Sequence, residues 1–515
     1  MQIPGLDLEF TALPAPLPIW RARVDAAQWL AAAQALREGG GRLLALWAGP
    51  ADAGVVTEVC AAYACPQGAC WLSLALDAGA AYPNLVPIFP AAGRMQRAAA
   101  DLSGIRAEGA SDRRPWLNHG SWPDDYRPLC APDASFPAPT PLQDYPFVRV
   151  EGDGVHEIPV GPVHAGIIEP GHFRFSIVGE KVLRLEERLG YTHKGIEQRV
   201  AQLPPMQAAK LAGRVSGDST VAYAWAWCMA LESATQTRVP ERAVWLRALL
   251  LERERIANHL GDLGALGNDA AFAFGLAQFS RLREDWLRLS HALFGHRWLM
   301  DRIVPGGVAV DLDGAGADRL RRQCNAIEDE VRTLYRIYES HAGLQDRFLT
   351  TGRVLPALAE QLGLTGLAGR ASGQVRDLRV DLSWEPYAGI GVNVASRRNG
   401  DVAARVAVRF DEVFESLRLI RRLLDAMPAG PIACTVTLPQ QAASGAGWVE
   451  GWRGEIWVAL ELAGADDGHS IRRCHLHDPS WQNWPVLEHA IMGNIVPDFP
   501  LINKSFNLSY SGQDL

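Results

Sequence analysis

The chain has 515 residues, of which 48% are hydrophobic and 21% charged, and its formal net charge is −8. This composition is typical of a globular protein of two to four domains, and the acidic balance argues against nucleic acid as a partner. The N-terminus has no basic start followed by an apolar core, and no apolar run reaches the roughly 18 residues of a membrane helix. We therefore expect a chain without a signal peptide that does not itself span a membrane.

The first part of the chain predicts a small α/β domain. Residues 26–37 form an alanine-rich helix pattern, and 42–47 and 70–76 are apolar runs of strand length. Residues 130–141 then contain four prolines, which fix φ and remove backbone donors, so we expect an extended linker there. We place the α/β domain at 1–128 and the Pro-rich linker at 129–147.

The remaining residues, 148–515, predict a mostly helical domain opened by a small antiparallel sheet. Residues 173–178 and 181–185 alternate as strands around Gly179 and Glu180, which indicates a hairpin. Apolar residues recur at three- and four-residue steps in 246–263 and 401–425, so each helix has one apolar face. We expect the arginines and acids of these helices to be solvated or paired along the helix. The predicted fold class is α+β.

Two groups of candidate metal ligands have simpler interpretations. Cys60, Cys65 and Cys70 are five residues apart, whereas zinc cysteines are more closely spaced and come in two pairs. Buried structural thiols in a reducing compartment are the favoured interpretation, and a metal or cluster fragment is the alternative. His475 and His477 fall on one face of a strand, but two ligands do not make a zinc site.

Several motifs in one order carry a family resemblance. They are Gly161-Pro-Val-His164, 169–174, 190–197, 214–219, 247–262, 301–307, 350–352, 371–377, 401–405 and 494–506. Together they resemble the large subunit of formate-hydrogenlyase-type (group 4) nickel-iron hydrogenases and the related quinone-site subunit of respiratory complex I. Residues 121–129 resemble the closing segment of the small complex I subunit that is fused in front of such large subunits. The resemblance implies a small complex I-like domain followed by a hydrogenase-large-subunit-like domain.

The chain departs from this family at the residues that bind metal and quinone. The nickel ligands of the family fall on Ser216, Ser219, Ser509 and Gly512, none of which supplies a thiolate, the soft ligand that holds nickel. We therefore expect no metal in this chain, and a polar remnant of the cavity in its place. A hard cation at Asp218 and the hydroxyls is the disfavoured alternative. The quinone-binding histidine and tyrosine of complex I fall on Ile168 and Gly217, whose side chains donate no hydrogen bond, so the familiar quinone geometry is not expected here.

The resemblance also implies which polar residues surround the old cavity. Glu169, Arg214, Asp218 and His164 are candidate proton or cavity residues, and we expect the first three to form its polar centre. The alternative is that they are ordinary ion pairs. The candidate quinone-cavity residues are His172, Tyr191, His193 and Tyr223.

The function implied is that of a peripheral-arm subunit in a membrane-associated complex of the NADH-quinone oxidoreductase and group 4 hydrogenase type. A small iron-sulfur subunit and membrane proton-pump-like subunits are the implied partners, and this chain binds no cofactor apart from a candidate quinone. The expected reaction is electron transfer to a quinone or other acceptor, coupled to ion translocation. A non-catalytic coupling scaffold is the alternative, and a working nickel-iron hydrogenase is disfavoured. We expect a cytoplasmic location, peripheral to the inner membrane.

Overall fold

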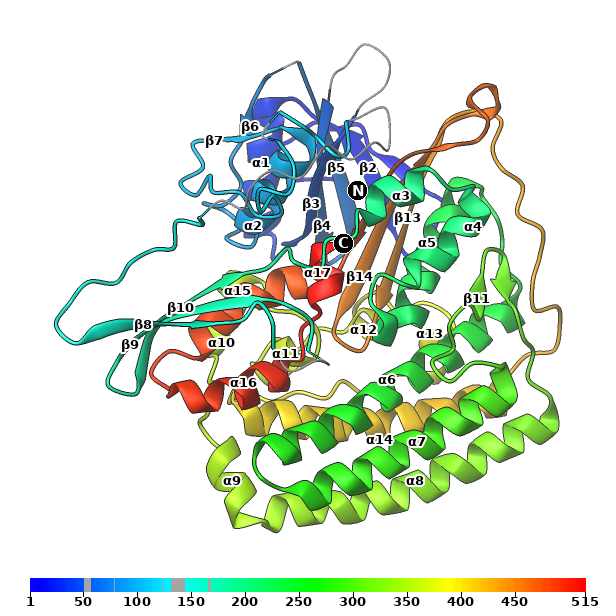
Figure 1. Ribbon diagram of the computed structural model, residues 1–515. Coiled ribbons are helices and arrows are strands. Elements are labelled where there is room, and N and C mark those ends of the chain that lie inside the picture. The colour runs from blue at the N-terminus through cyan, green and yellow to red at the C-terminus, as the bar shows by residue number, and fades with distance from the viewer. Residues whose placement is uncertain (51–56, 78, 124, 131–143, 165–167) are drawn as a thin grey trace.

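The computed structural model describes residues 1–50, 57–77, 79–123, 125–130, 144–164 and 168–515 (Figure 1). Residues up to 130 form a front unit, and residues from 144 onward form a large unit. Most of the predicted linker, 131–143, lies outside the described residues, so the domain boundaries stay a prediction. Within the described part of the chain, each helix is too short or too polar to cross a bilayer.

A five-stranded sheet with two helices forms the front unit. The strand order is β1-β2-β5-β4-β3, in which β2 and β5 are parallel and the other neighbours antiparallel. The predicted helix and both predicted strands are confirmed. The elements are β1 Thr11–Leu13, β2 Ile19–Arg23, α1 Ala26–Glu38, β3 Arg42–Gly49, β4 Thr57–Cys65, β5 Gly68–Leu76, β6 Tyr82–Pro83, α2 Ala92–Ser103 and β7 Ala107–Glu108.

Local chemistry explains where α1 begins. Asp25 accepts a hydrogen bond from the backbone N–H of Gln28 at 2.8 Å, and the Gln28 side chain accepts one from the Asp25 N–H at 3.0 Å. This reciprocal capping box satisfies two N–H groups that the first helical turn leaves without partners. Behind the helix, Cys60 and Cys70 are buried and Cys65 is half-buried in the sheet, in line with the structural-thiol interpretation.

The large unit opens with the predicted hairpin, to which a third strand is added. This sheet has the order β10-β9-β8 and projects from the body of the molecule (Figure 1). Four long helices lie side by side at the other end: α6, α7, α8 and α14. The elements up to α8 are β8 Val155–Val160, β9 His172–Val178, β10 Lys181–Arg188, α3 Ile196–Ala201, α4 Pro205–Ala212, the 3₁₀ turn Gly217–Ser219, α5 Thr220–Ala234, α6 Glu241–Asp269, α7 Ala273–Phe294, β11 Ile303–Val304, β12 Gly307–Val308 and α8 Gly314–Ser340.

Short helices and a second three-stranded sheet complete the large unit. The elements are α9 Ala342–Phe348, α10 Pro356–Leu362, α11 Gly366–Ala371, α12 Leu378–Asp381, α13 Tyr387–Ile390, α14 Val402–Ala426, β13 Ala443–Glu450, β14 Glu455–Leu462, the 3₁₀ turn Ala465–Asp467, β15 Ile471–His477, α15 Ser480–Ala490, the 3₁₀ turn Val496–Asp498, α16 Phe499–Phe506 and α17 Tyr510–Asp514. The α+β class is confirmed. The sheet β13-β14-β15 is an addition, because only an opening sheet was predicted.

Two glycines explain how the second sheet packs. A Cβ atom at Gly447 would lie 1.9 Å from the carbonyl oxygen of Ala226, and one at Gly445 would lie 2.0 Å from that of Ala230. These glycines are two residues apart on β13, so they share one face, and the two alanines are one turn apart on α5. The backbone of α5 therefore rests directly on the sheet.

Buried polar contacts join the two units. Arg473 of β15 pairs with Glu58 of β4, and the rings of Trp47 and His475 stack with centroids 4.9 Å apart. The ring of His475 is also held by Glu197, whose carboxylate lies 2.6 Å from Nδ1. The second sheet thus serves as the surface on which the front sheet packs.

Candidate functional site

The four positions at which the family carries nickel ligands converge in space. Ser216 precedes the turn into α5 and Ser509 precedes α17, yet their hydroxyl oxygens are 2.9 Å apart. Ser509 Oγ also accepts a hydrogen bond from the Gly512 N–H at 2.8 Å. Ser219 is joined to the same group by the Arg453 guanidinium, which donates to its hydroxyl at 3.2 Å. We refer to Ser216, Ser219, Ser509 and Gly512 as the former ligand cluster.

An ion pair between the buried Arg453 and the half-buried Asp218 fills one side of this cluster. Arg453 Nη1 donates to Asp218 Oδ1 at 2.8 Å, and Nη2 donates to Oδ2. Ser216 donates to the same carboxylate at 2.7 Å. Burial raises the pKa of Asp218, but the Arg453 charge and hydrogen bonds outweigh burial and leave the pKa below its ordinary value. Asp218 is therefore ionised and fully engaged near neutral pH.

A second carboxylate occupies the space at position 512. Asp478 accepts a hydrogen bond from the Tyr223 hydroxyl at 2.7 Å and from the backbone N–H of Ser480 at 2.8 Å. A Cβ atom on Gly512 would lie 2.4 Å from Asp478 Oδ2. Burial raises the pKa of both Asp478 and Tyr223. A side chain at position 512 would therefore clash with the Asp478 carboxylate, which its hydrogen bonds hold in place.

These residues do not fit a nickel-iron centre. Such a centre needs thiolate sulfur, and the cluster offers two mutually bonded serine hydroxyls, a third serine and a glycine. A hard cation fits no better, because both oxygens of Asp218 are taken by Arg453 and the buried guanidinium is itself positive. The cluster residues and Asp218 are thus satisfied by hydrogen bonds and an ion pair among themselves and with Arg453.

The last helix is held by residues of the 190–194 segment. Asp514 accepts hydrogen bonds from the Gly190 N–H at 2.9 Å and from the Thr192 hydroxyl at 2.6 Å, and burial raises its pKa to about 6. His193 Nδ1 lies 2.7 Å from the Asp514 carbonyl oxygen. Lys194 donates to the Ser511 carbonyl at 3.3 Å, and burial lowers its pKa. These contacts fix α17, and with it Ser509 and Gly512.

Three more of the predicted site residues contact these segments. Glu169 accepts weak hydrogen bonds from the backbone N–H groups of Tyr510 and Ser511, at 3.3 and 3.4 Å. Asp218 bonds Ser216 of the former ligand cluster, whereas Tyr223 reaches the cluster through Asp478. The structure therefore brings Glu169, Asp218, His193 and Tyr223 to one region.

The other predicted residues lie elsewhere. Arg214 forms a bidentate ion pair with Asp301, both bonds at 2.7 Å, and its side chain is 41% exposed. It therefore stands apart from the expected polar centre and makes an ordinary surface pair. His164 bonds the Gly171 carbonyl at 2.9 Å, while His172 and Tyr191 line a separate cavity of about 680 Å³ between the hairpin and residues 144–149.

The charged side chains of α6 are buried from Arg247 to Asp262, so the expectation of a solvated face is wrong there, whereas Arg255 and Glu252 do pair along the helix. Glu254 is 3% exposed and accepts hydrogen bonds from the N–H groups of Val221 and Ala222, at 2.6 and 3.2 Å, where α5 begins. Burial raises the pKa of Glu254 to about 8. Asn258, one turn later, donates to the Asp218 carbonyl at 2.7 Å. The helix is enclosed by its neighbours, and partners distant in sequence satisfy its charges.

Sequence reasoning missed Arg453 and Glu254 as site residues. Arg453 lies in a tight turn between two strands and has no motif around it. The i,i+4 spacing of Glu254 and Asn258 was the available signal, since it puts both on one side of α6. His475 and His477, the two histidines considered for zinc, have other partners in the structure, namely Glu197 and Gln482.

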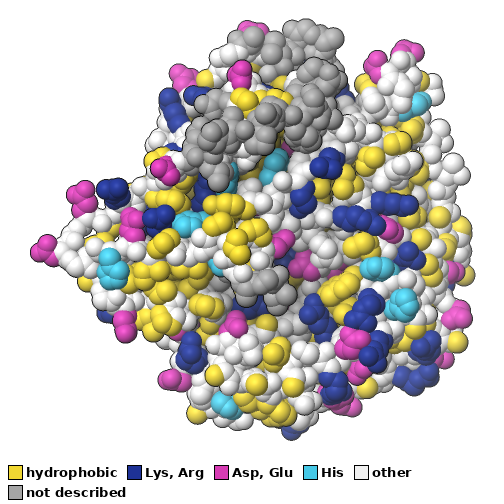
Figure 2. Space-filling view, in the orientation of Figure 1, with side chains coloured by type: hydrophobic (Ala, Val, Ile, Leu, Met, Phe, Trp, Pro, Cys, Tyr) yellow, Lys and Arg dark blue, Asp and Glu magenta, His cyan; other side chains and the backbone are white. Residues whose placement is uncertain are grey.

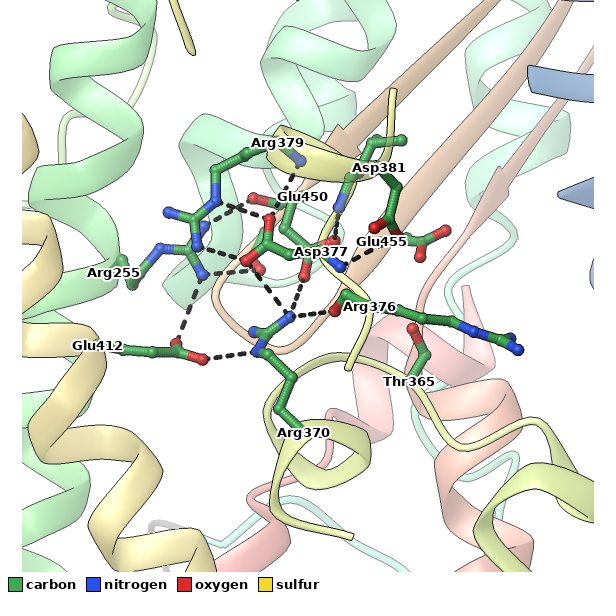
Figure 3. Close-up of polar contacts among 12 residues, drawn as sticks. Arg255, Thr365, Arg370, Arg376, Asp377, Arg379, Asp381, Glu412, Glu450 and Glu455 are labelled. Atoms are coloured by element: carbon green, nitrogen blue, oxygen red, sulfur yellow. Dashed lines mark hydrogen bonds and ion pairs between the residues drawn. The ribbon is translucent and has the colours of Figure 1, made fainter. Parts of the chain in front are cut away.

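A network of buried charges adjoins the site (Figure 3). Arg370 is fully buried and bonds Glu412 at 2.8 Å and Glu450 at 2.9 Å, with Asp377 at 3.6 Å. His259 of α6 contacts the other oxygen of Glu412 at 2.7 Å. Burial raises the pKa of Glu450 to about 7. The network ties α6, α11 and α14 to the end of β13.

Comparisons with known proteins agree with this architecture. The sequence profile of the 49-kDa subunit of respiratory-chain NADH dehydrogenase matches residues 262–444, and that of the 30-kDa subunit matches residues 22–132. Formate hydrogenlyase subunit 5 of Escherichia coli (strain K12) is 32% identical over 456 residues, which are 86% of this chain and 79% of the relative. The carbon monoxide-induced hydrogenase of Rhodospirillum rubrum is 31% identical, over 68% of this chain and 97% of that protein.

A complex I protein and a solved structure extend the similarity. The C/D protein of NADH-quinone oxidoreductase from Bacteroides thetaiotaomicron is 28% identical over 74% of this chain and 76% of its own length. A chain of the membrane-bound sulfane sulfur reductase, an archaeal respiratory membrane complex, shares the fold with a TM-score of 0.65 and 24% identity, over 70% of this chain and 99% of that chain. The chain thus belongs to the family of complex I-like and group 4 hydrogenase-related subunits of membrane oxidoreductase complexes, in which a 30-kDa-type domain is fused to a 49-kDa-type domain.

Proposed function

We propose that this chain is the large peripheral-arm subunit of such a complex and that it works without a nickel-iron centre. In this role it takes part in electron transfer from an iron-sulfur cluster of a partner subunit to a quinone or other acceptor, coupled to ion translocation. The observation that carries the proposal is the former ligand cluster, in which hydroxyl–hydroxyl contact and the Arg453–Asp218 ion pair stand where a soft metal needs thiolates.

The polar groups around the cluster suit proton handling. Glu169 contacts the first turn of α17 and Asp514 is its last residue, and burial raises the pKa of Asp514 to about 6, within reach of physiological pH changes. Carboxylates in such surroundings take up or release a proton when a nearby charge changes. The proposed role of Glu169 is to pass or hold a proton when the neighbouring electron carrier changes its redox state.

Exposed apolar side chains support a protein partner near this region. Val163 is 85% exposed and Ile168 50% exposed, both on the segment that leads to Glu169. Hydrophobic side chains also gather over the projecting sheet β8–β10 on the face that Figure 2 shows. A subunit that works only when assembled presents apolar surface of this kind. We propose the small iron-sulfur subunit as the partner here, and a cytoplasmic location at the membrane through further partner subunits.

A quinone has two candidate places. One is the cavity lined by His172 and Tyr191. The other is Gly217, where complex I carries its quinone-binding tyrosine: a Cβ atom built there would meet no described atom within 4 Å. A side chain at position 217 would therefore begin in open space among the described residues, while glycine itself supplies no hydrogen-bond donor from a side chain.

The test is purification of the assembled complex through a tag on this chain, followed by metal analysis and assay of quinone reduction. We expect iron without nickel, and quinone-dependent electron transfer that Glu169→Gln uncouples from ion movement. Stoichiometric nickel would refute the metal-free proposal, and unchanged coupling in E169Q would remove Glu169 from the mechanism. Tyr335→Phe serves as the control, because Tyr335 lies on α8, away from the cluster.

A coupling scaffold is the second candidate function. The observation that favours it is that Ile168 and Gly217 replace both quinone-binding side chains of the complex I pattern. If the scaffold is the true role, the purified complex moves no electrons to any quinone, yet deletion of this chain dissociates its partners. Electron transfer that persists in the intact complex and is lost when His172 and Tyr191 are replaced would exclude the scaffold.

A further inference from the structure

The front unit contains a cavity that the proposed function does not use. It has a volume of about 290 Å³ and lies between α2, β7 and the segment 110–118. Five arginines line it, against two aspartates. The arginines are Arg97, Arg106, Arg113, Arg114 and Arg127. With the aspartates ionised, five positive and two negative charges leave the lining at +3. We call it the arginine cavity.

Asp112 engages two of the arginines. It accepts a hydrogen bond from Arg114 Nη2 at 2.7 Å and from Arg97 Nη1 at 3.1 Å. The Arg114 and Arg97 charges hold the pKa of Asp112 below its ordinary value, against the opposing effect of burial. Asp112 therefore stays ionised and fixes both guanidinium planes against the wall of the cavity.

Asp101 is also engaged, but through only one oxygen. Its Oδ2 accepts hydrogen bonds from the backbone N–H groups of Trp116, Leu117 and Asn118, at 2.7, 2.7 and 3.1 Å. These bonds fix the segment 116–118 to α2. Among the described residues, Oδ1 has no hydrogen-bond donor. Asp101 thus holds one wall of the cavity in place through Oδ2, and its Oδ1 remains as an acceptor for a hydroxyl group of a ligand.

Arg106 and Arg113 bring uncompensated charge to the cavity. The Arg106 side chain forms no ion pair or hydrogen bond with any described residue, and Arg113 donates to the Ala110 carbonyl, at 3.2 Å, instead of to a carboxylate. Arg127 packs against Gly104, the left-handed residue that ends α2, where a Cβ atom would lie 2.6 Å from Arg127 Nε. Because residue 104 is glycine and has no side chain, there is room for the Arg127 side chain beside the cavity.

We propose that the arginine cavity binds a small phosphate-bearing molecule. Guanidinium groups match phosphate oxygens in pairs, and several of them converge here from different segments. The volume is close to the lower limit of ligand pockets, which suits a phosphate or diphosphate with a small organic group. Asp101 Oδ1 and the Asn118 amide then contact a hydroxyl of that group. The cavity shares no residue with the former ligand cluster, so the proposal stands independently of the proposed function.

The test is isothermal titration of the purified chain or complex with diphosphate, inorganic phosphate and ADP at low ionic strength. We expect saturable binding that weakens at least tenfold in R106A/R113A and falls as salt is added, because salt screens the attraction. The matched control is R288A/R332A, which removes two exposed arginines, one on α7 and one on α8. This variant should bind as the wild type does. Circular dichroism confirms that each variant is folded.

The three ligands separate the sources of the phosphate. Tighter binding of ADP than of diphosphate indicates an organic phosphate, and equal binding indicates that the phosphate groups alone are recognised. Absence of saturable binding to all three, or equal loss in R106A/R113A and R288A/R332A, would overturn the proposal. Neither result bears on nickel content or on quinone reduction.

Discussion

Removal of the Arg370 charge should destabilise the protein strongly. Arg370 is fully buried, and it is the shared partner of Glu412, Glu450 and Asp377 (Figure 3). In Arg370→Met the apolar stem is kept, but the carboxylates lose their common cation. Loss of one partner from a buried ion pair destabilises by about 3–5 kcal/mol. We expect a loss of that size in the free energy of unfolding at pH 8.

The loss should depend on pH. With Arg370 present, the pKa of Glu450 is already raised to about 7 by burial. In the variant the pKa of Glu450 rises further. As the pH is lowered from 8, Glu450 therefore takes up a proton, and its unpaired charge disappears. A group whose folded pKa exceeds its unfolded value contributes stability below the unfolded pKa and loses it as pH rises through the folded pKa. R370M should therefore be closer to wild type at pH 6 than at pH 8, by up to about 1.4 kcal/mol per pH unit for each carboxyl.

Urea unfolding followed by the fluorescence of the 17 tryptophans measures this difference. The matched control is Arg288→Met, which removes an exposed arginine whose side chain is 72% accessible and paired with Glu284. A surface pair contributes about 0–1 kcal/mol, so R288M should stay within that range at both pH values. If R370M also stays within about 1 kcal/mol of wild type, or if its loss is the same at pH 6 and pH 8, the reasoning about buried charge is refuted.

Two further changes test the packing around the former ligand cluster. Burial raises the pKa of Glu254 to about 8, so the contribution of Glu254 to stability should fall as pH rises from about 5 to 8. Glu254→Gln should remove this contribution to the slope when urea midpoints are compared across the range with those of the wild type. An unchanged slope would contradict the raised pKa. Gly447→Ala forces a methyl group into the α5 backbone and should lower the thermal midpoint or abolish soluble expression, whereas Gly314→Ala, with no neighbour within 4 Å, should not. Equal behaviour of the two alanine variants would count against direct contact of α5 with the sheet.

The elements that the sequence predicted well are those with strong local patterns. The hairpin β9–β10 alternates with a period of two, and α6 and α14 carry apolar residues at helical spacing, so their positions follow from chain-local chemistry. The sheet β13–β15 was missed. Gly445 and Gly447 weaken the strand pattern of β13, and they are needed because the α5 backbone lies against them. That reason is visible only in the tertiary structure.

The burial of charge on α6 was also beyond local patterns. Glu252 is satisfied by Arg379, Tyr387 and Ser416, more than a hundred residues away in the chain. A helix wheel shows such a residue on a polar face and predicts exposure. Only the packing of several distant segments shows that this face is enclosed.

Positions 216, 219, 509 and 512 are serine or glycine, so the sequence alone excludes thiolate ligands there. Whether a residue can supply a thiolate depends only on its own side chain and not on the fold. Motif order also placed the chain in its family. What occupies the vacated positions was decided by the tertiary structure, which brings Arg453 to Asp218 across 235 residues and Tyr223 to Asp478 across 255. Contacts of such range depend on how helices and sheets pack, and no local spacing encodes them.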